Sequence, residues 1–255
     1  MEIFFYHTPD QAPAMSKDAI KGEQVPDSPD CAIVIDVLRA TTTIATALKA
    51  GAEAIHAFKD LDTLLRISSR WPYKNRLLAG ERGGQKLDGF DLGNSPFDYM
   101  TDAVTGKRIF MSTTNGTRAL DRMQSVSLLL TASLTNRAAV VRFLKKRQPH
   151  TVWIVAAGCN GKFSLEDTIC AGAIACGLGA GLDINHYAGN DESIAAISLF
   201  NFWENRLEDL ISYTKHGCYL ASLGYEEDLN YCTQLDIVDI VPIQVEPAVL
   251  KPLLV

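Results

Sequence analysis

Two segments of the chain repeat one pattern, in which an apolar run breaks into hydroxyl-bearing residues and continues with helical periodicity. The first segment is residues 33–43 (IVIDVLRATTT) and the second is residues 109–120 (IFMSTTNGTRAL). Apolar runs without alternation are typical of parallel strands that are covered on both faces. Each segment therefore predicts a buried strand that leads through a short turn into a helix.

Strand-like and helix-like stretches alternate along most of the chain. Strands are predicted at 32–37, 54–58, 76–79, 108–112, 127–132 and 151–157, and helices at 42–50, 60–69, 117–123, 134–147 and 165–177. Such alternation indicates βα units, so we predict an α/β fold with mostly parallel sheets in a layered α/β/α arrangement. A long helix at 193–210 and a final strand at 236–245 complete the prediction.

The two halves of the chain resemble each other beyond their first turns. A Gly-rich loop follows a later strand in each half, and Gly80 and Gly158 stand at nearly equal offsets from Asp36 and Ser112. We interpret this as an internal duplication of a βα-repeat unit. The alternative is that any two βα units look alike at this level of detail.

The chain length sets the expected domain organisation. Because 255 residues suffice for one large α/β domain, we expect residues 1–255 to form a single compact protein. The repeat halves would be residues 30–104 and 105–185, with the C-terminal segment 186–255 packing on them.

Charge and composition exclude several classes of partner. The net charge is −6, and the longest basic run is residues 145–147, which argues against a nucleic-acid surface. No apolar stretch approaches membrane-spanning length, and the N-terminus lacks a signal pattern, so we expect no membrane partner and a cytoplasmic location. The six cysteines form no Cys-x-x-Cys pair, which suits a reducing compartment. The oligomeric state stays open between a monomer and a homodimer.

The first hydroxyl-rich turn carries a candidate catalytic and anion-binding group. Asp36 stands at the tip of an apolar strand, where a buried carboxylate requires a partner or a cation. Arg39, Thr41 and Thr42 could hold a phosphate with a guanidinium, hydroxyls and helix N-terminal amides. The alternative is that Asp36 pairs with Arg39 or caps the following helix.

The second turn offers the same chemistry from the other half of the chain. Thr114, Asn115, Gly116 and Thr117 are candidate phosphate ligands, and Arg118 follows them. We expect Gly116 to occupy a place that a side chain would obstruct. Plain helix capping uses the same residue types and is the alternative. If both turns bind one ligand, they should line a shared cleft beyond the carboxyl ends of the strands.

Four carboxylates could form an oxygen-rich metal site. Glu81 and Arg82 lie between glycines, where the backbone can approach a ligand, although a solvent-exposed turn has the same composition. Glu166 and Asp167 begin a predicted helix, where the helix dipole alone favours acids. Together with Asp36 and Glu81 they would present the oxygen ligands that Mg²⁺ prefers.

Common phosphate-handling motifs are missing from the sequence. Lys162 is followed by Phe163, so the phosphate-loop pattern of ATP-binding proteins is not met. Asp36 lacks a second Asp two positions on, and no Cys is followed by Arg six positions later. His216 follows Lys215 rather than Arg and is more often structural than catalytic in such a context.

Five separated motifs, in order, resemble the 2-phosphosulfolactate phosphatase family. They are residues 36–43 (DVLRATTT), 80–84 (GERGG), 93–96 (GNSP), 113–118 (TTNGTR) and 163–167 (FSLED), and the segments 216–217 and 224–228 are similar to the family's final motif. The resemblance covers almost the whole chain. It implies a Mg²⁺-dependent phosphoric monoester hydrolase that converts 2-phospho-3-sulfolactate to 3-sulfolactate and phosphate.

The resemblance also sets expectations for the site and the pathway. Asp36, Arg39 and Glu81 become candidate catalytic residues, with water attacking the phosphorus directly or, alternatively, through a phospho-Asp36 intermediate. The small anionic substrate would meet Arg39, Arg82, Arg118 and Lys162. In methanogens this step belongs to coenzyme M biosynthesis, but family members also occur elsewhere. The competing function is a non-catalytic binder of small phosphorylated metabolites.

Overall fold

The computed structural model describes residues 1–13 and 28–254. The strands are β1 (Glu2–Tyr6), β2 (Cys31–Ile35), β3 (Ala54–Ala57), β4 (Arg76–Arg82), β5 (Gln85–Lys86), β6 (Arg108–Ser112), β7 (Leu129–Ala132), β8 (Thr151–Ala156), β9 (Ile240–Glu246) and β10 (Val249–Leu254). The α-helices are α1 (Ala40–Lys49), α2 (Leu61–Ser68), α3 (Gly116–Met123), α4 (Arg137–Arg147), α5 (Leu165–Leu178), α6 (Ile184–Tyr187), α7 (Asp191–Trp203), α8 (Leu207–Tyr213), α9 (Lys215–Ser222) and α10 (Glu226–Cys232). Short 3₁₀ helices are η1 (Tyr73–Asn75), η2 (Pro96–Tyr99), η3 (Asp102–Val104) and η4 (Leu134–Asn136).

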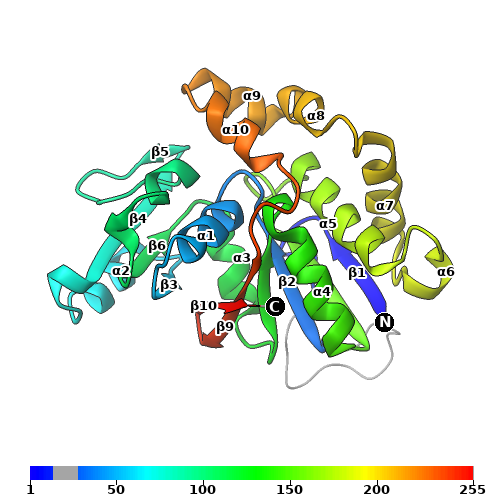
Figure 1. The fold of residues 1–255 in the computed structure, drawn as a ribbon, viewed down its shortest axis with the longest axis horizontal. Coiled ribbons are helices and arrows are strands. Elements are labelled where there is room, and N and C mark those ends of the chain that lie inside the picture. Colours follow the sequence, from blue (N-terminus) through cyan, green and yellow to red (C-terminus); the bar gives the residue numbers. More distant parts are fainter. Residues whose placement is uncertain (14–27, 255) are drawn as a thin grey trace.

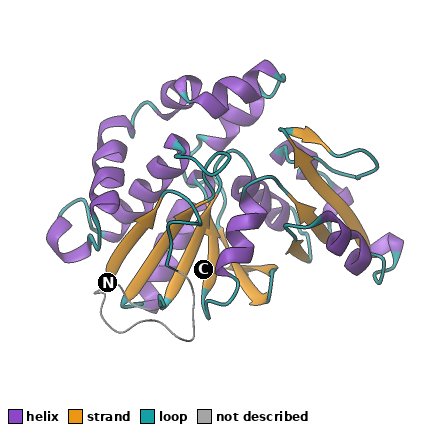
Figure 2. Cartoon of the chain, turned by 180° about the vertical axis from the view of Figure 1, so that it is seen from behind, coloured by secondary structure: helices purple, strands orange, loops and turns teal. Residues whose placement is uncertain are grey.

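The described strands form a ten-stranded mixed sheet in the order β1-β8-β2-β7-β9-β10-β3-β6-β4-β5. β1, β8, β2 and β7 are parallel neighbours, and so are β3, β6 and β4. The antiparallel hairpin β9–β10 joins these two parallel blocks (Figure 1). Figure 2 shows the same sheet from behind. The predicted α/β class and its mostly parallel strands are confirmed.

Helices cover both faces of the larger block, because successive side chains of a strand point to opposite faces. Ile33 and Ile35 of β2 belong to a core with residues of α4, α5 and α7. Ala32 and Val34 belong to a second core with residues of α1 and α3. All five residues of β2 are buried, which explains the lack of alternation in its sequence.

The two predicted halves interleave in the sheet. β2, from the first half, lies between β7 and β8 of the second half. β6, from the second half, lies between β3 and β4 of the first. This arrangement places each half's first strand among strands of the other half. The duplication itself stays a prediction.

The single helix that the sequence predicted at 193–210 is two helices, α7 and α8. α7 ends at Trp203, and Arg206 adopts φ −145° and ψ 41°, outside the helical region. The Arg206 guanidinium lies 4.7 Å from the centre of the Trp203 ring, so the chain folds back on the helix end. Within the described residues, no helix combines the length and apolar character needed to cross a membrane.

Candidate functional site

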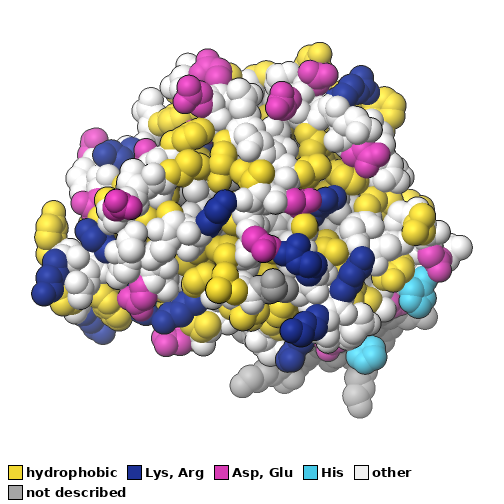
Figure 3. Space-filling model, viewed as in Figure 1, with side chains coloured by type: hydrophobic (Ala, Val, Ile, Leu, Met, Phe, Trp, Pro, Cys, Tyr) yellow, Lys and Arg dark blue, Asp and Glu magenta, His cyan; other side chains and the backbone are white. Residues whose placement is uncertain are grey.

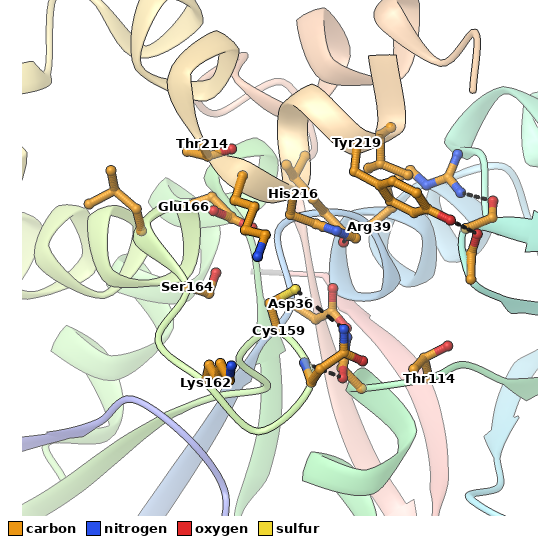
Figure 4. Close-up of a pocket in the computed structure, with 18 of the residues that line it drawn as sticks. Asp36, Arg39, Thr114, Cys159, Lys162, Ser164, Glu166, Thr214, His216 and Tyr219 are labelled. Carbon is orange, nitrogen blue, oxygen red and sulfur yellow. Dashed lines mark hydrogen bonds between the residues drawn. The ribbon is translucent and has the colours of Figure 1, made fainter. Parts of the chain in front are cut away.

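A cavity of about 570 Å³ lies where the strand ends, the Gly-rich loops and the C-terminal helices meet. Its walls come from the β2–α1 turn, the β4–β5 turn, the β6–α3 turn, the β8–α5 loop and α9. Both hydroxyl-rich turns contribute residues, so the prediction that they share one cleft is confirmed. Figure 4 shows Thr214 and His216 above the cavity, with Asp36, Cys159 and Lys162 below them.

Asp36 lies at the floor of the cavity, directly after β2. It is 7% exposed, and its Oδ1 accepts a hydrogen bond from the Ala40 amide at 3.2 Å. Burial raises the pKa of Asp36 to about 7, the Ala40 hydrogen bond opposes this shift, and the carboxylates of Glu81 and Glu166 add to it. Without a metal, the protonated form of Asp36 is therefore favoured up to a higher pH than that of an exposed aspartate.

Glu81 forms hydrogen bonds with both the Gly-rich β4–β5 turn and the hydroxyl-rich β6–α3 turn. Its Oε1 accepts a hydrogen bond from the Thr114 amide at 2.7 Å, and its Oε2 accepts one from the Gly84 amide at 2.8 Å. The side chain is buried and lines the cavity. Glu81 is buried and bonded to both turns, so it is not the solvent-exposed turn residue that its sequence context also allowed.

Glu166 and Asp167 stand side by side at the start of α5 but face different surroundings. Glu166 is buried and lines the cavity. Asp167 accepts hydrogen bonds from the amides of Val37, at 2.9 Å, and Gly158, at 3.2 Å, and it is not among the cavity-lining residues. Burial, then repulsion from Asp36 and Glu166, raises the pKa of Asp167 well above its usual range. Asp167 thus joins the β2–α1 turn to the β8–α5 loop.

Arg39 lines the cavity, but its guanidinium is already engaged. It forms an ion pair with Asp228 of α10, donates to the Gly84 carbonyl at 2.7 Å, and lies 4.1 Å from the centre of the Tyr225 ring. Asp228 also accepts a hydrogen bond from the Ser95 hydroxyl at 2.7 Å. The sequence also allowed a pair between Arg39 and Asp36, but Arg39 pairs with Asp228, a carboxylate far away in the sequence.

The other two predicted arginines do not line the cavity. Arg82 turns back on its own sheet, donating to the Glu81 carbonyl at 2.7 Å and to the Ser112 hydroxyl at 2.9 Å. The Arg118 side chain is 51% exposed and lies 3.7 Å from Asp10.

Three predicted threonine ligands use their hydroxyls locally. Thr41 Oγ1 donates to the Asp36 carbonyl and Thr42 Oγ1 to the Val37 carbonyl, at 2.9 and 2.8 Å. Thr117 Oγ1 donates to the Thr113 carbonyl at 2.8 Å. They shape the two turns and are not among the cavity-lining residues.

Of the remaining predicted ligands of the second turn, Thr114 and Asn115 lie at the cavity, and Gly116 is not among the lining residues. The Thr114 hydroxyl is buried without a hydrogen-bond partner among the described residues. A Cβ at Gly116 would lie 2.7 Å from Asp36 Oδ2 and 2.6 Å from the Ala40 Cβ, so the expected obstruction is confirmed. Glycine here lets the two turns touch.

Sequence reasoning missed several residues at the cavity. Asn94 lies in the motif at residues 93–96 and lines the cavity, and its Oδ1 is buried without a partner among the described residues. Lys215, Tyr219 and His216 reach the cavity from α9. His216 Nε2 lies 2.9 Å from the Leu38 carbonyl, and the Tyr219 hydroxyl donates to the Gly83 carbonyl at 3.0 Å. Only the motif at 216–217 signalled this contribution.

The donor chemistry of the cavity fits Mg²⁺ with few protein ligands. Asp36, Glu81 and Glu166 line it and form no ion pair within residues 1–13 and 28–254. In the same residues, no three His, Cys, Asp or Glu side chains converge closely enough to form a metal centre by themselves. Mg²⁺ commonly binds through one or two carboxylates, with water and substrate phosphate as its other ligands. Asp36 and Glu166 fit that mode, and Asp167, outside the lining, fits it less well.

Fold and cavity together define an α/β protein with a carboxylate-lined cavity beyond the ends of its parallel strands. Residues 15–247 match the family model described as 2-phosphosulpholactate phosphatase. Relatives named probable 2-phosphosulfolactate phosphatase include one from Nostoc punctiforme, 51% identical over 253 residues and 98% of each chain. Another, from Synechocystis, is 52% identical over 251 residues, covering 98% of this chain and 99% of the relative. The chain belongs to the 2-phosphosulfolactate phosphatase family, which confirms the resemblance.

Proposed function

We propose that this protein is a Mg²⁺-dependent phosphatase that hydrolyses 2-phospho-3-sulfolactate to 3-sulfolactate and phosphate. One observation carries the proposal. Three buried carboxylates, Asp36, Glu81 and Glu166, line one cavity without a basic partner among the described residues. Such an arrangement is costly unless a cation offsets the charge. Membership of the family supports the choice of substrate.

Asp36 and Glu166 are the residues that we expect to hold the metal. When bound, Mg²⁺ would neutralise charge on the phosphoryl oxygens and orient the phosphoryl group. Glu81 would keep the Thr114 and Gly84 amides in place, because its two oxygens already accept their hydrogens. The positions of the β4–β5 and β6–α3 turns around the substrate would then depend on Glu81.

Asp36 is also our candidate for handling the proton of the attacking water. Burial raises the pKa of Asp36 to about 7 without a metal, and a bound Mg²⁺ would lower it and favour the ionised carboxylate, the form that can accept a proton. We favour direct attack by water on phosphorus. Acid quench during turnover followed by mass spectrometry of Asp36 tests the alternative, because a phospho-Asp36 intermediate would add a phosphoryl group to that residue.

The proposed function is tested by phosphate release from synthetic 2-phospho-3-sulfolactate, with Mg²⁺ and with a chelator. We expect release only with Mg²⁺ and a strong decrease in Asp36→Asn. Other 2-phospho acids in the same screen define the substrate range. A protein that binds the compound without releasing phosphate would be the non-catalytic binder and would refute the phosphatase.

We also propose a cytoplasmic location, with the protein either a monomer or a homodimer. All six cysteines are free thiols, which supports a reducing, cytoplasmic location. Light scattering on the purified protein distinguishes the monomer from the homodimer. On the face drawn in Figure 3, acidic and basic side chains are interspersed, in keeping with a small-molecule substrate.

A further inference from the structure

The three arginines that the sequence predicted to bind the substrate are not available to its sulfonate group. Arg39 is held by Asp228 and the Gly84 carbonyl. Arg82 and Arg118 are not among the residues that line the cavity. The proposed substrate carries a phosphate, a carboxylate and a sulfonate, so other cations are needed to offset its charge.

Two lysines line the same cavity from different parts of the chain. Lys162 belongs to the β8–α5 loop, and Lys215 is the first residue of α9. Neither forms an ion pair within residues 1–13 and 28–254, although three carboxylates line the cavity as well. Both ammonium groups therefore stay available to an anionic ligand in this cavity.

Each of the two lysines is related to Cys159 of the β8–α5 loop. The main chains of Lys162 and Cys159 exchange two hydrogen bonds, at 2.9 and 3.0 Å, which shapes the loop into a tight turn. Burial raises the pKa of the Cys159 thiol, and the carboxylates of Glu166, Asp167 and Asp36 add to this shift. The Lys215 ammonium acts in the opposite direction, as a cation near this loop does. Figure 4 shows Lys162 and Cys159 on the loop beneath α9.

We propose that Lys162 and Lys215 form the sulfonate subsite and thereby select sulfonated 2-phospho acids. This inference rests on the proposed function. The phosphoryl group carries the highest charge density and is the part of the substrate that suits Mg²⁺ beside Asp36 and Glu166. The sulfonate is a strong acid whose single charge is spread over three oxygens, and two mobile ammonium groups can each donate to it.

If these lysines bind the sulfonate, removing them should lower activity on the sulfonated substrate more than on one without the sulfonate. A general loss of positive charge would lower both activities alike. Lys162→Met, Lys215→Met and the double variant are compared on 2-phospho-3-sulfolactate and on 2-phospholactate, which keeps the phosphate and carboxylate but lacks the sulfonate. We expect the ratio of kcat/KM for the two substrates to fall about tenfold in each single variant, the scale of a hydrogen bond to a charged group. Titration calorimetry with 3-sulfolactate and with lactate supplies a readout that does not need turnover.

Lys74→Met is the matched control, because Lys74 lies in η1, is exposed and does not line the cavity. It removes the same charge and should leave the substrate ratio unchanged. Equal losses on both substrates would overturn the proposal, because the lysines would then contact the phosphate or carboxylate. An unchanged ratio in the double variant would overturn it too. If wild-type protein binds 3-sulfolactate through these lysines but releases no phosphate, the subsite stands and the proposed function fails.

Discussion

Arg39 and Asp228 are separated by 189 residues and form a buried ion pair. The pair joins the β2–α1 turn to α10. The other terminal nitrogen of the guanidinium donates to the Gly84 carbonyl and so joins the same turn to the β4–β5 turn. Removing one partner of a buried pair leaves the other charge uncompensated. Arg39 therefore links α10 to two of the loops that form the cavity.

Asp228→Ala should lower the free energy of unfolding by about 3–5 kcal/mol, the usual effect of breaking a buried pair. Arg39→Lys should also destabilise the fold, because an ammonium cannot hold Asp228 and Gly84 in the same fork. Urea denaturation followed by circular dichroism measures both. The resemblance had made Arg39 a candidate catalytic residue. An Arg39→Lys protein with wild-type stability and a reduced kcat would restore that view.

Arg118→Lys should leave both kcat and KM nearly unchanged. The side chain is half exposed, pairs only loosely with Asp10, and does not line the cavity. Surface substitutions of this kind usually change stability by less than about 0.5 kcal/mol. Steady-state kinetics on 2-phospho-3-sulfolactate checks the expectation. A several-fold increase in KM would show that Arg118 meets the substrate, as its sequence position suggested.

Asp36→Asn should lower kcat at least about a hundredfold, the effect of losing a metal ligand or a positioned base. The Asn side chain keeps the size of Asp, so the acceptor for the Ala40 amide is retained. The folded state should be preserved, and circular dichroism provides that control. A rate close to wild type at saturating Mg²⁺ would remove Asp36 from the chemistry.

The raised pKa of Asp36 also predicts how stability changes with pH in a chelator. The folded state takes up the Asp36 proton more tightly than the unfolded chain, since the pKa rises from 3.8 to about 7. The stabilisation is full below pH 4 and is lost as pH rises to about 7, by up to roughly 4 kcal/mol. The stability difference between Asp36→Asn and wild type should therefore grow in favour of the variant over that range.

Thermal unfolding at pH 4 and pH 7.5, with chelator, measures this difference. Mg²⁺ should restore the wild-type stability at the higher pH without affecting Asp36→Asn to the same extent. A constant difference between the two proteins across the range would mean that Asp36 is ionised in the folded state throughout.

Glu166→Gln and Asp167→Ala should separate metal binding from fold. Glu166 lines the cavity, so Glu166→Gln should raise the Mg²⁺ concentration for half-maximal phosphate release about tenfold or more, with little change in stability. Asp167 accepts the amides of Val37 and Gly158, so Asp167→Ala should lower the unfolding free energy by about 2–4 kcal/mol. The Mg²⁺ concentration for half-maximal rate and urea denaturation provide the measurements. The opposite pattern would exchange the two roles.

The sequence predicted much of the fold because the relevant signals are local. The strand at 108–112 agrees with β6 in both bounds, and the helix at 165–177 ends one residue before α5 does. A shared cavity followed from the rule that ligands lie beyond the carboxyl ends of parallel strands. Asp36 and Glu81, which line that cavity, stood out because a carboxylate after an apolar strand or within a Gly-rich loop is unusual, whereas Glu166 was noted as an acid at the start of a predicted helix.

The directions of the arginines could not be predicted. Arg39, Arg82 and Arg118 all follow or flank motifs, yet their long side chains reach Asp228, Ser112 and Asp10. Which partner a guanidinium meets depends on residues that are distant in the sequence. The same applies to Thr41, Thr42 and Thr117, because a hydroxyl that shapes a turn and one that binds a ligand have the same sequence context.

The amino-acid sequence by itself determined the βα units, the two hydroxyl-rich turns and the family, since each depends on neighbouring residues. Only the tertiary structure decided that the β9–β10 hairpin joins the two parallel blocks, and that α9 brings Lys215 to the cavity. Strand order and the pairing of buried charges come from contacts between distant segments. Those contacts form because burying apolar faces and compensating buried carboxylates lowers the free energy of the whole chain.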